Sequence, residues 1–226
     1  GHWDKVQELV CEWIADFGEP DEKDMGHFPW HDHATALRLD RLSVMRLVPN
    51  GPNFATLAQL HAQLLLQESF YSKHTNHGYD QALALLLASV VFAEDCDTSE
   101  WARVGLARLQ DELSIAFNNE GVHIENSPAY HVGMTANLVR ARMVLMCLGV
   151  DPGFDFEALL EKALLFTAWI TRPDRNLALL GDSTERRGTP PQDLRHLNNY
   201  KYALYAATGG KEGSPLDSTV AVYPNA

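Results

Sequence analysis

Apolar side chains recur at helical spacing along almost the whole chain, and this period constrains the fold more than any other feature. In residues 2–17, Trp3, Val6, Val10, Trp13 and Phe17 lie three or four positions apart, and Gly18 follows. The same pattern predicts further helices at residues 34–47, 54–71, 82–92, 99–117, 128–148, 156–171 and 193–208. We therefore expect an all-α fold.

Most of the loops between these predicted helices are short. Short connections make consecutive helices antiparallel neighbours, so the expected architecture is a stack or ring of αα-hairpins. The sequence shows no fixed-period repeat of the kind that builds regular solenoids. An irregular helical barrel is therefore favoured.

The size and charge of the chain limit its class. It has 226 residues, 46% of them hydrophobic, which suits one large domain or two small ones. Its net charge of -12 repels nucleic acid and anionic membranes, so we expect no nucleic-acid partner, although a local cationic pocket would still admit an acidic substrate. No apolar stretch reaches the roughly 18 residues of a membrane span, so none is expected.

The chain has three cysteines, Cys11, Cys96 and Cys147, which lie far apart in apolar or helical surroundings. We expect core thiols and no disulfide framework. The chain begins Gly-His-Trp, and we expect it to be a piece of a longer protein whose targeting signal is out of view.

A polar stretch, residues 74–80, precedes the most apolar run of the chain, residues 82–92. That run is apolar on all sides, which predicts a buried helix. Thr75 or Asn76 is expected to cap its start, and Asn76 and His77 are expected at its mouth. Buried polar groups are costly unless they are satisfied or used. The simplest interpretation is that both residues are only caps.

Three polar clusters lie at or just before predicted helix starts. They are residues 30–33, followed by Arg38 in the next helix, residues 74–77, and residues 120–131. Alternate helices of an antiparallel array start at the same end. If these three helices are alternate ones, the clusters converge on one mouth.

Several kinds of chemistry fit these clusters poorly. HExxH is absent, so the candidate metal ligands His31, Asp32, His33, His123, Glu125 and His131 fit a zinc site only loosely. Neither a GxSxG elbow nor a glycine-rich phosphate loop occurs, and we expect no metal and no cofactor. A set of Tyr, His and Asn side chains instead suits removal of a proton α to a carboxylate, which needs a neutralising group, a base and an acid.

Three motifs, in this order and spacing, resemble the heparinase II/III-like polysaccharide lyases. They are Asn76-His77-Gly78, the segment from Glu120 to His131 (Glu-Gly-Val-His-Ile-Glu-Asn-Ser-Pro-Ala-Tyr-His), and Gly181-Asp182-Ser183. Asn76 and Tyr130 are 54 residues apart, as the family pattern requires, and the segment from Trp30 to Arg38 is similar to the preceding family helix. The resemblance covers residues 30–183.

The resemblance implies an incomplete (α/α) toroid that is followed by a β-sandwich domain. We accordingly expect a toroid over residues 1–208, and a linker with the first strand of the sandwich over residues 209–226. The remainder of the sandwich, which supplies a further His in the family, would be a partner outside this chain. The family also implies a periplasmic or secreted protein.

The resemblance also implies roles for individual residues. Asn76 would neutralise a uronate carboxylate, His77 would be its partner or the base, and Tyr130 would be the acid and, for one stereochemistry, the base. The substrate would be an acidic polysaccharide or oligosaccharide, and few basic residues near the motifs argue mildly against heavy sulfation. Secondary expectations are that His33, Arg38 and His131 contact substrate, that Arg38 pairs with Asp32 or Asp40, that Glu125 holds the Tyr130 segment, and that Asp182 is a turn residue.

Two alternatives stay open. An inverting glycoside hydrolase needs two carboxylates roughly 6.5–9.5 Å apart, and its candidates here are Glu120, Glu125 and Asp182. In a non-catalytic helical binding or scaffold module, Asn76, His77 and Tyr130 would only satisfy buried backbone. The identity of the glycan and endo or exo action are left open.

Overall fold

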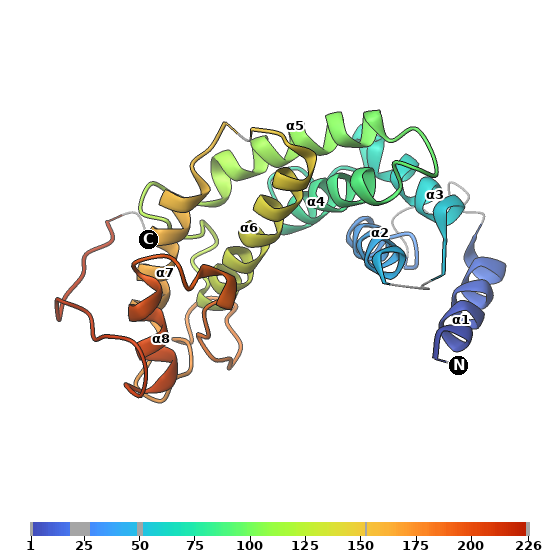
Figure 1. The fold of residues 1–226 in the computed structure, drawn as a ribbon. Helices are drawn as coiled ribbons and strands as arrows, with labels where there is room; N and C mark the ends of the chain where they lie inside the picture. The colour runs from blue at the N-terminus through green and yellow to red at the C-terminus, as the bar shows by residue number, and fades with distance from the viewer. Residues whose placement is uncertain (1, 19–27, 49–51, 152, 225–226) are drawn as a thin grey trace. The chain divides into compact units, whose positions relative to one another are not determined.

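The structure is a computed structural model that describes residues 2–18, 28–48, 52–151 and 153–224, and these residues are mainly helical (Figure 1). The α-helices are α1 (His2–Phe17), α2 (Asp32–Leu47), α3 (Ala55–Leu66), α4 (Asn76–Val91), α5 (Ser99–Ala116), α6 (Pro128–Leu148), α7 (Phe156–Ile170) and α8 (Tyr200–Thr208). Two short 3-10 helices are η1 (Glu68–Phe70) and η2 (Gln192–Leu194). The described residues form isolated β-bridges but no strand, so the all-α prediction is confirmed.

Two predicted helices are shorter than expected. The helix predicted for residues 54–71 ends at Leu66, because Gln67 takes an extended conformation (φ -65°, ψ 130°) before η1 begins. The helix predicted for residues 193–208 begins only at Tyr200. The Glu161 carboxylate accepts hydrogen bonds from the backbone N–H groups of Asn198 (2.7 Å) and Asn199 (2.8 Å), and these bonds hold the preceding segment outside the helix.

The chain divides into two compact units, Gly1–Leu113 and Ser114–Ala226, with the boundary in the last turn of α5. In the first unit α2 packs against both α3 and α4. In the second unit α7 packs against both α6 and α8. The boundary predicted at residue 208 stays a prediction. α8 does end at Thr208, and residues 209–224 contain neither helix nor strand.

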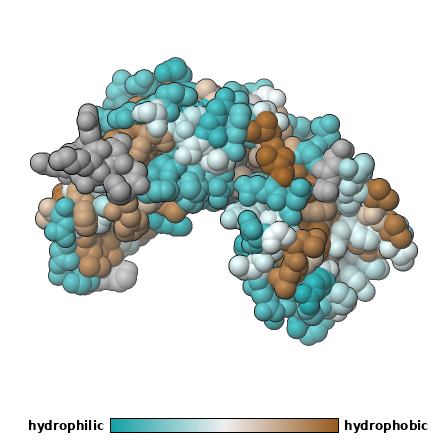
Figure 2. Space-filling model, turned by 180° about the vertical axis from the view of Figure 1, so that it is seen from behind, coloured by the Kyte–Doolittle hydropathy of each residue, from teal (hydrophilic) through white to brown (hydrophobic). Residues whose placement is uncertain are grey.

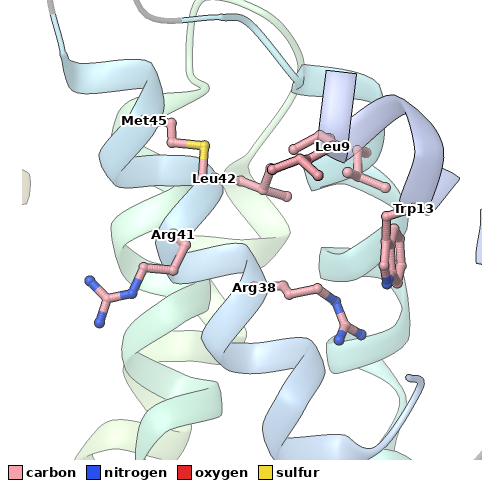
Figure 3. A pocket seen from close by; sticks show the side chains of 8 residues that line it. Leu9, Trp13, Arg38, Arg41, Leu42 and Met45 are labelled. Atoms are coloured by element: carbon pink, nitrogen blue, oxygen red, sulfur yellow. The ribbon is translucent and has the colours of Figure 1, made fainter. Parts of the chain in front are cut away.

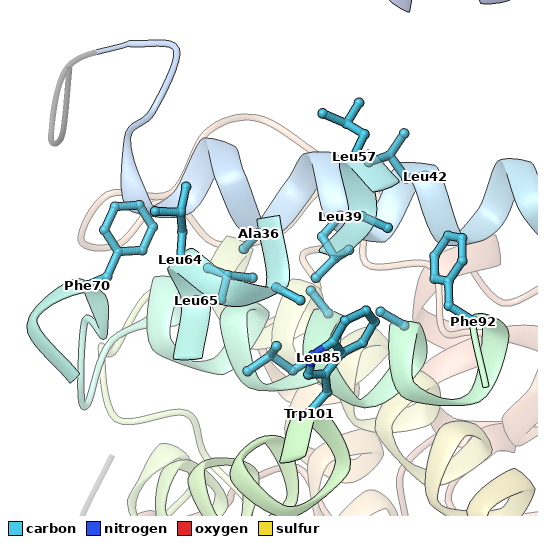
Figure 4. Packing of buried hydrophobic residues seen from close by; sticks show 14 of the residues in the cluster. Ala36, Leu39, Leu42, Leu57, Leu64, Leu65, Phe70, Leu85, Phe92 and Trp101 are labelled. Carbon is cyan, nitrogen blue, oxygen red and sulfur yellow. The ribbon is translucent and has the colours of Figure 1, made fainter. Parts of the chain in front are cut away.

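The core of the first unit surrounds α4. Its residues from Ala82 to Leu86 are all buried, as the uniformly apolar run predicted. Leu85 has no exposed surface and belongs to one buried cluster with Leu39 of α2, Leu65 of α3 and Trp101 of α5 (Figure 4). In the second unit the fully buried leucines include Leu138 of α6 with Leu160 and Leu164 of α7.

The surface differs from expectation at the cysteines. All three are free thiols, but Cys11 and Cys147 are exposed, so the prediction of core thiols is wrong for both. Both lie on helices at positions that face solvent. Seen from behind, the surface is mostly hydrophilic with separate hydrophobic patches (Figure 2). Within the described ranges, no helix combines the length and apolar character needed to cross a bilayer.

Replacing Leu85 with Ala should lower the free energy of unfolding by about 2–5 kcal/mol, because the lost side chain leaves a cavity in a fully buried site. Leu37→Ala on α2 is the matched control, since Leu37 is 43% exposed and should change stability by less than about 1 kcal/mol. Urea unfolding measures both. Equal losses would contradict the placement of this core around α4.

Candidate functional site

The starts of α2 and α4 meet in the first unit. His33 Nε2 of α2 lies 2.8 Å from Asp80 Oδ2 of α4, and His77 Nδ1 of α4 lies 3.1 Å from Asp32 Oδ2 of α2. These alternate helices therefore begin at the same end. The predicted convergence is confirmed for the first two polar clusters.

The histidine rings of these two helix starts are in contact. The rings of His33 and His77 are stacked, with centroids 4.0 Å apart and an interplanar angle of 17°. His31 meets His77 edge-on at 5.8 Å, and its Nδ1 lies 2.7 Å from Asp32 Oδ1. His77 and His33 are partly exposed (34% and 25% of the side chain), so the stacked pair reaches solvent.

Asp32 is the centre of this cluster. Burial by itself raises the pKa of its carboxyl, but hydrogen bonds from the Ser72 hydroxyl, the backbone N–H of His33 and the His77 ring outweigh burial, so the pKa lies below its usual value. Asp32 is also the first residue of α2, where the helix dipole favours a negative charge. The sequence indicated Asp32 as a loose metal ligand or a partner of Arg38, and not as a partner of His77. Its position at a helix start between two histidines was the available signal.

The cap of α4 is Thr75. Its side-chain oxygen accepts a hydrogen bond from the Gly78 N–H at 3.2 Å. Asn76 is the first residue of the helix and is half-buried. In the part of the chain that the structure describes, its side-chain amide has no hydrogen-bond partner. The interpretation of Asn76 as only a capping residue is therefore not supported.

A buried acid holds the loop that leads into α4. Glu112, 3% exposed, accepts hydrogen bonds from the Tyr71 hydroxyl (2.6 Å) and the His74 backbone N–H (2.9 Å). Burial and the neighbouring Glu112 carboxylate raise the pKa of Tyr71 well above its usual value. A Cβ at Gly78 would collide with the Ser72 carbonyl and the Glu112 carboxylate. This contact explains the glycine that follows Asn76 and His77.

Arg38 serves the packing of the first unit. Its guanidinium lies over the rings of Trp13 (4.7 Å) and Trp30 (5.4 Å), and it donates to His61 Nε2 at 3.0 Å and to the Pro29 carbonyl. The predicted pairing with Asp32 or Asp40 is therefore wrong. Burial lowers the pKa of Arg38 to about 10. The side chain extends toward Trp13 (Figure 3), where both line an apolar cavity of about 160 Å³.

In the second unit, two of the predicted motifs meet at the start of α6. Ser127 Oγ accepts the Tyr130 N–H at 3.4 Å, so Ser127 is the cap of α6. Ser183 Oγ lies 3.0 Å from Ser127 Oγ and accepts the Ala129 N–H at 3.1 Å. Ser183, rather than the exposed Glu125, therefore holds this segment.

Tyr130 lies in the first turn of α6 and is 36% exposed. Ser183, which holds this helix start, directly follows a turn that contains the predicted turn residue Asp182. Gly181, just before it, has φ +55°, a value that a glycine adopts without strain. The sequence therefore places Tyr130 on a helix start that another segment of the second unit fixes.

His131, predicted to contact substrate, lies in the core instead. It is 1% exposed, and its Nε2 lies 3.0 Å from the Ala163 carbonyl, while its Nδ1 accepts the His123 N–H at 3.4 Å. Burial lowers the pKa of His131 to about 4. The structure thus contradicts a direct contact, because helical period turns residue 131 inward when Tyr130 faces outward.

The remaining metal candidates are scattered. In the described ranges, no group of three or more His, Cys, Asp or Glu side chains is arranged to hold a metal ion. His123 is 3% exposed, and burial lowers its pKa to about 4. The chemistry that this arrangement offers is that of amide, imidazole, phenol and carboxylate groups at helix starts.

The chain resembles known proteins along most of its length. Residues 29–204 match the family described as Heparinase II/III N-terminus. The heparin-sulfate lyase of Bacteroides stercoris is 24% identical over 226 residues, which cover 93% of this chain and 34% of that relative. The heparin-sulfate lyase of Pedobacter heparinus is also 24% identical, with 92% of this chain and 35% of that relative covered. The chain thus spans about a third of the length of these curated relatives.

A solved structure agrees with the fold. The crystal structure of heparinase III superposes with a TM-score of 0.69 and 22% identity, over 92% of this chain and 36% of that chain. At this identity the likeness shows the fold alone. It confirms the predicted fold class, the helical toroid portion of such an enzyme.

Gly78→Ala should destabilise the protein by about 1–3 kcal/mol, because the added methyl group overlaps the Ser72 carbonyl and the Glu112 carboxylate. Gly133→Ala on α6 is the matched control, since its Cβ would meet only Arg186 Nη1 at 4.0 Å. That change should be neutral or slightly stabilising, as alanine favours a helix interior. Thermal unfolding compares the two, and a harmless Gly78→Ala would show that the loop tolerates a side chain.

Stability should fall on acidification between about pH 6.5 and pH 4. In this window the unfolded chain binds a proton at His131 while the folded chain keeps the ring neutral, which costs about 3 kcal/mol in total at pH 4. Above pH 6.5 both states are neutral and the term vanishes. His131→Gln, which keeps a side-chain N–H donor, should make the pH dependence shallower by about 1.4 kcal/mol per pH unit. Urea unfolding at pH 7, 6 and 5 tests this, and an unchanged slope would contradict it.

Proposed function

The chain belongs to the heparinase II/III N-terminus family, and from this premise we propose that its protein is a polysaccharide lyase. The proposed reaction cleaves a uronic-acid-containing glycan by β-elimination. A base removes the C5 proton, the C4–O4 bond breaks, a C4–C5 double bond forms, and an acid protonates the leaving oxygen. The fragment that keeps O4 ends in an intact sugar. The other fragment carries an unsaturated uronic acid at its new end.

One observation carries this proposal. Thr75 caps α4, so the amide of Asn76 is left without a partner among the described residues, directly beside His77. An amide that donates hydrogen bonds to a uronate carboxylate disperses its negative charge and makes the adjacent C5 proton more acidic. His77 is the neighbouring base. A helix start that needed only capping would not require either side chain.

Tyr130 is the proposed acid and His33 a proposed substrate contact. Tyr130 is partly exposed on a helix start that Ser127 and Ser183 hold in place. His33 lies against His77 and reaches solvent. Arg38 and His131 are left out of the proposed site, because both are engaged within the protein.

The wider setting belongs to the same proposal. The relatives are named heparin-sulfate lyases, and we propose for this protein an acidic polysaccharide or oligosaccharide. We propose that it acts in the periplasm or outside the cell, where such polymers are met. A β-sandwich domain after residue 208 would complete the site.

Asn76→Ala and Tyr130→Phe should each lower kcat/KM at least about 100-fold, as expected for loss of charge stabilisation or of a general acid. The assay follows the ultraviolet absorbance of the unsaturated product with the whole protein, on a panel that includes heparan sulfate and alginate. Tyr205→Phe on α8 is the control and should keep full activity. New reducing ends without ultraviolet absorbance would indicate a hydrolase, and binding without cleavage would indicate a binding module.

A further inference from the structure

We propose that Asp32 is the positioning residue for His77, and that it holds the imidazole with its proton on Nδ1 and its basic nitrogen, Nε2, toward the substrate. The inference rests on the proposed function, since it assigns how that site prepares its base. It concerns a residue that acts through another and makes no direct contact with the sugar.

The tautomer follows from the hydrogen bond. His77 Nδ1 lies 3.1 Å from Asp32 Oδ2. An ionised carboxylate can only accept, so Nδ1 must be the nitrogen that carries the proton. A neutral imidazole has one N–H, and Nε2 therefore keeps its lone pair. Nε2 has no hydrogen-bond partner among the residues that the structure describes.

Asp32 is held in the ionised form from several sides. The Ser72 hydroxyl donates to Oδ2, His31 Nδ1 lies 2.7 Å from Oδ1, and the N-terminus of α2 favours negative charge. These contacts keep the pKa of Asp32 low despite its burial. With a side chain only 17% exposed, the carboxylate is sheltered from water that would compete for the His77 proton.

A second acid–histidine pair lies against the His77 ring. Asp80 of α4 binds His33 of α2 at 2.8 Å, and the His33 ring stacks on His77. The two acid–histidine pairs are crossed, because each helix supplies the acid for the histidine of the other. The Asp80–His33 pair therefore serves as an internal control. It joins the same two helices, but its histidine is His33, whereas the proposed base His77 follows Asn76 in sequence.

The decisive variants are Asp32→Asn and Asp80→Asn. If Asp32 positions the base, Asp32→Asn should lower kcat about 100-fold or more with little change in KM. Asp80→Asn should act mainly on KM, through the proposed substrate contact His33. If the crossed pairs only join the two helices, both variants should change kcat, KM and melting temperature to the same extent. That result would overturn the proposal. Asp32→Glu, which restores a carboxylate, should recover part of kcat.

Nitrogen NMR of protein labelled with ¹⁵N-histidine tests the tautomer without any activity. The His77 signals are assigned by their absence in His77→Gln. The expected spectrum of the neutral ring has a protonated Nδ1 and an unprotonated Nε2, and Asp32→Asn should shift this toward a mixture. A proton on Nε2 in the unmodified protein, or a tautomer that Asp32→Asn leaves unchanged, would contradict the proposal.

The two readouts separate the two proposals. If the unmodified protein shows the Nδ1–H tautomer but forms no unsaturated product from any uronic polymer, the lyase function fails while the Asp32–His77 pair stands. If lyase activity is present with the opposite tautomer, the positioning role fails alone. Should Asp32→Asn not fold, Ser72→Ala, which removes one donor to Asp32, must lower kcat in the same direction by a smaller factor.

Discussion

The burial of α4 on all sides is the constraint on which the first unit depends. A helix whose flanks face apolar neighbours carries polar side chains at its ends or where a partner satisfies them, as the Phe70 carbonyl and the Ser72 N–H do for the buried Gln81. Thr75 satisfies the Gly78 N–H in the first turn of the helix, and the buried Glu112 accepts the His74 N–H of the preceding loop. Once these groups are satisfied, Asn76 and His77 are the side chains that remain at the open end.

The second unit uses a related solution at α6. Its first turn is capped by Ser127, and the hydroxyl of Ser183 fastens that cap from a segment more than fifty residues later. In both units a helix start is therefore held by side chains from outside the helix. This makes the position of a half-exposed side chain such as Tyr130 depend on tertiary contacts, which suits a group that must be held in one place.

Local features were predictable from the sequence. The helices, the Thr75 and Ser127 caps and the all-round burial of residues 82–86 follow from period, capping chemistry and hydropathy. Features that depend on residues distant in sequence could not be predicted. Nothing local shows that Glu161 delays the start of α8, or that two tryptophans and His61 enclose Arg38. His131 is polar, but the helical phase of α6 turns it inward, and polarity alone does not give that phase.

The crossed pairs between α2 and α4 also fix the register of the two helices. A slide of α4 by one residue, about 1.5 Å along its axis, would disturb both acid–histidine contacts at once, since each helix holds one acid and one histidine. The contacts between the starts of α2 and α4 therefore depend on how the two helices pack along their shared length. The buried cluster that contains Leu39 of α2 and Leu85 of α4 lies between the same two helices, so a change of side-chain volume there bears on the spacing of the helices that carry both pairs. In this unit the packing of the core and the geometry of the histidine cluster therefore depend on the same pair of helices.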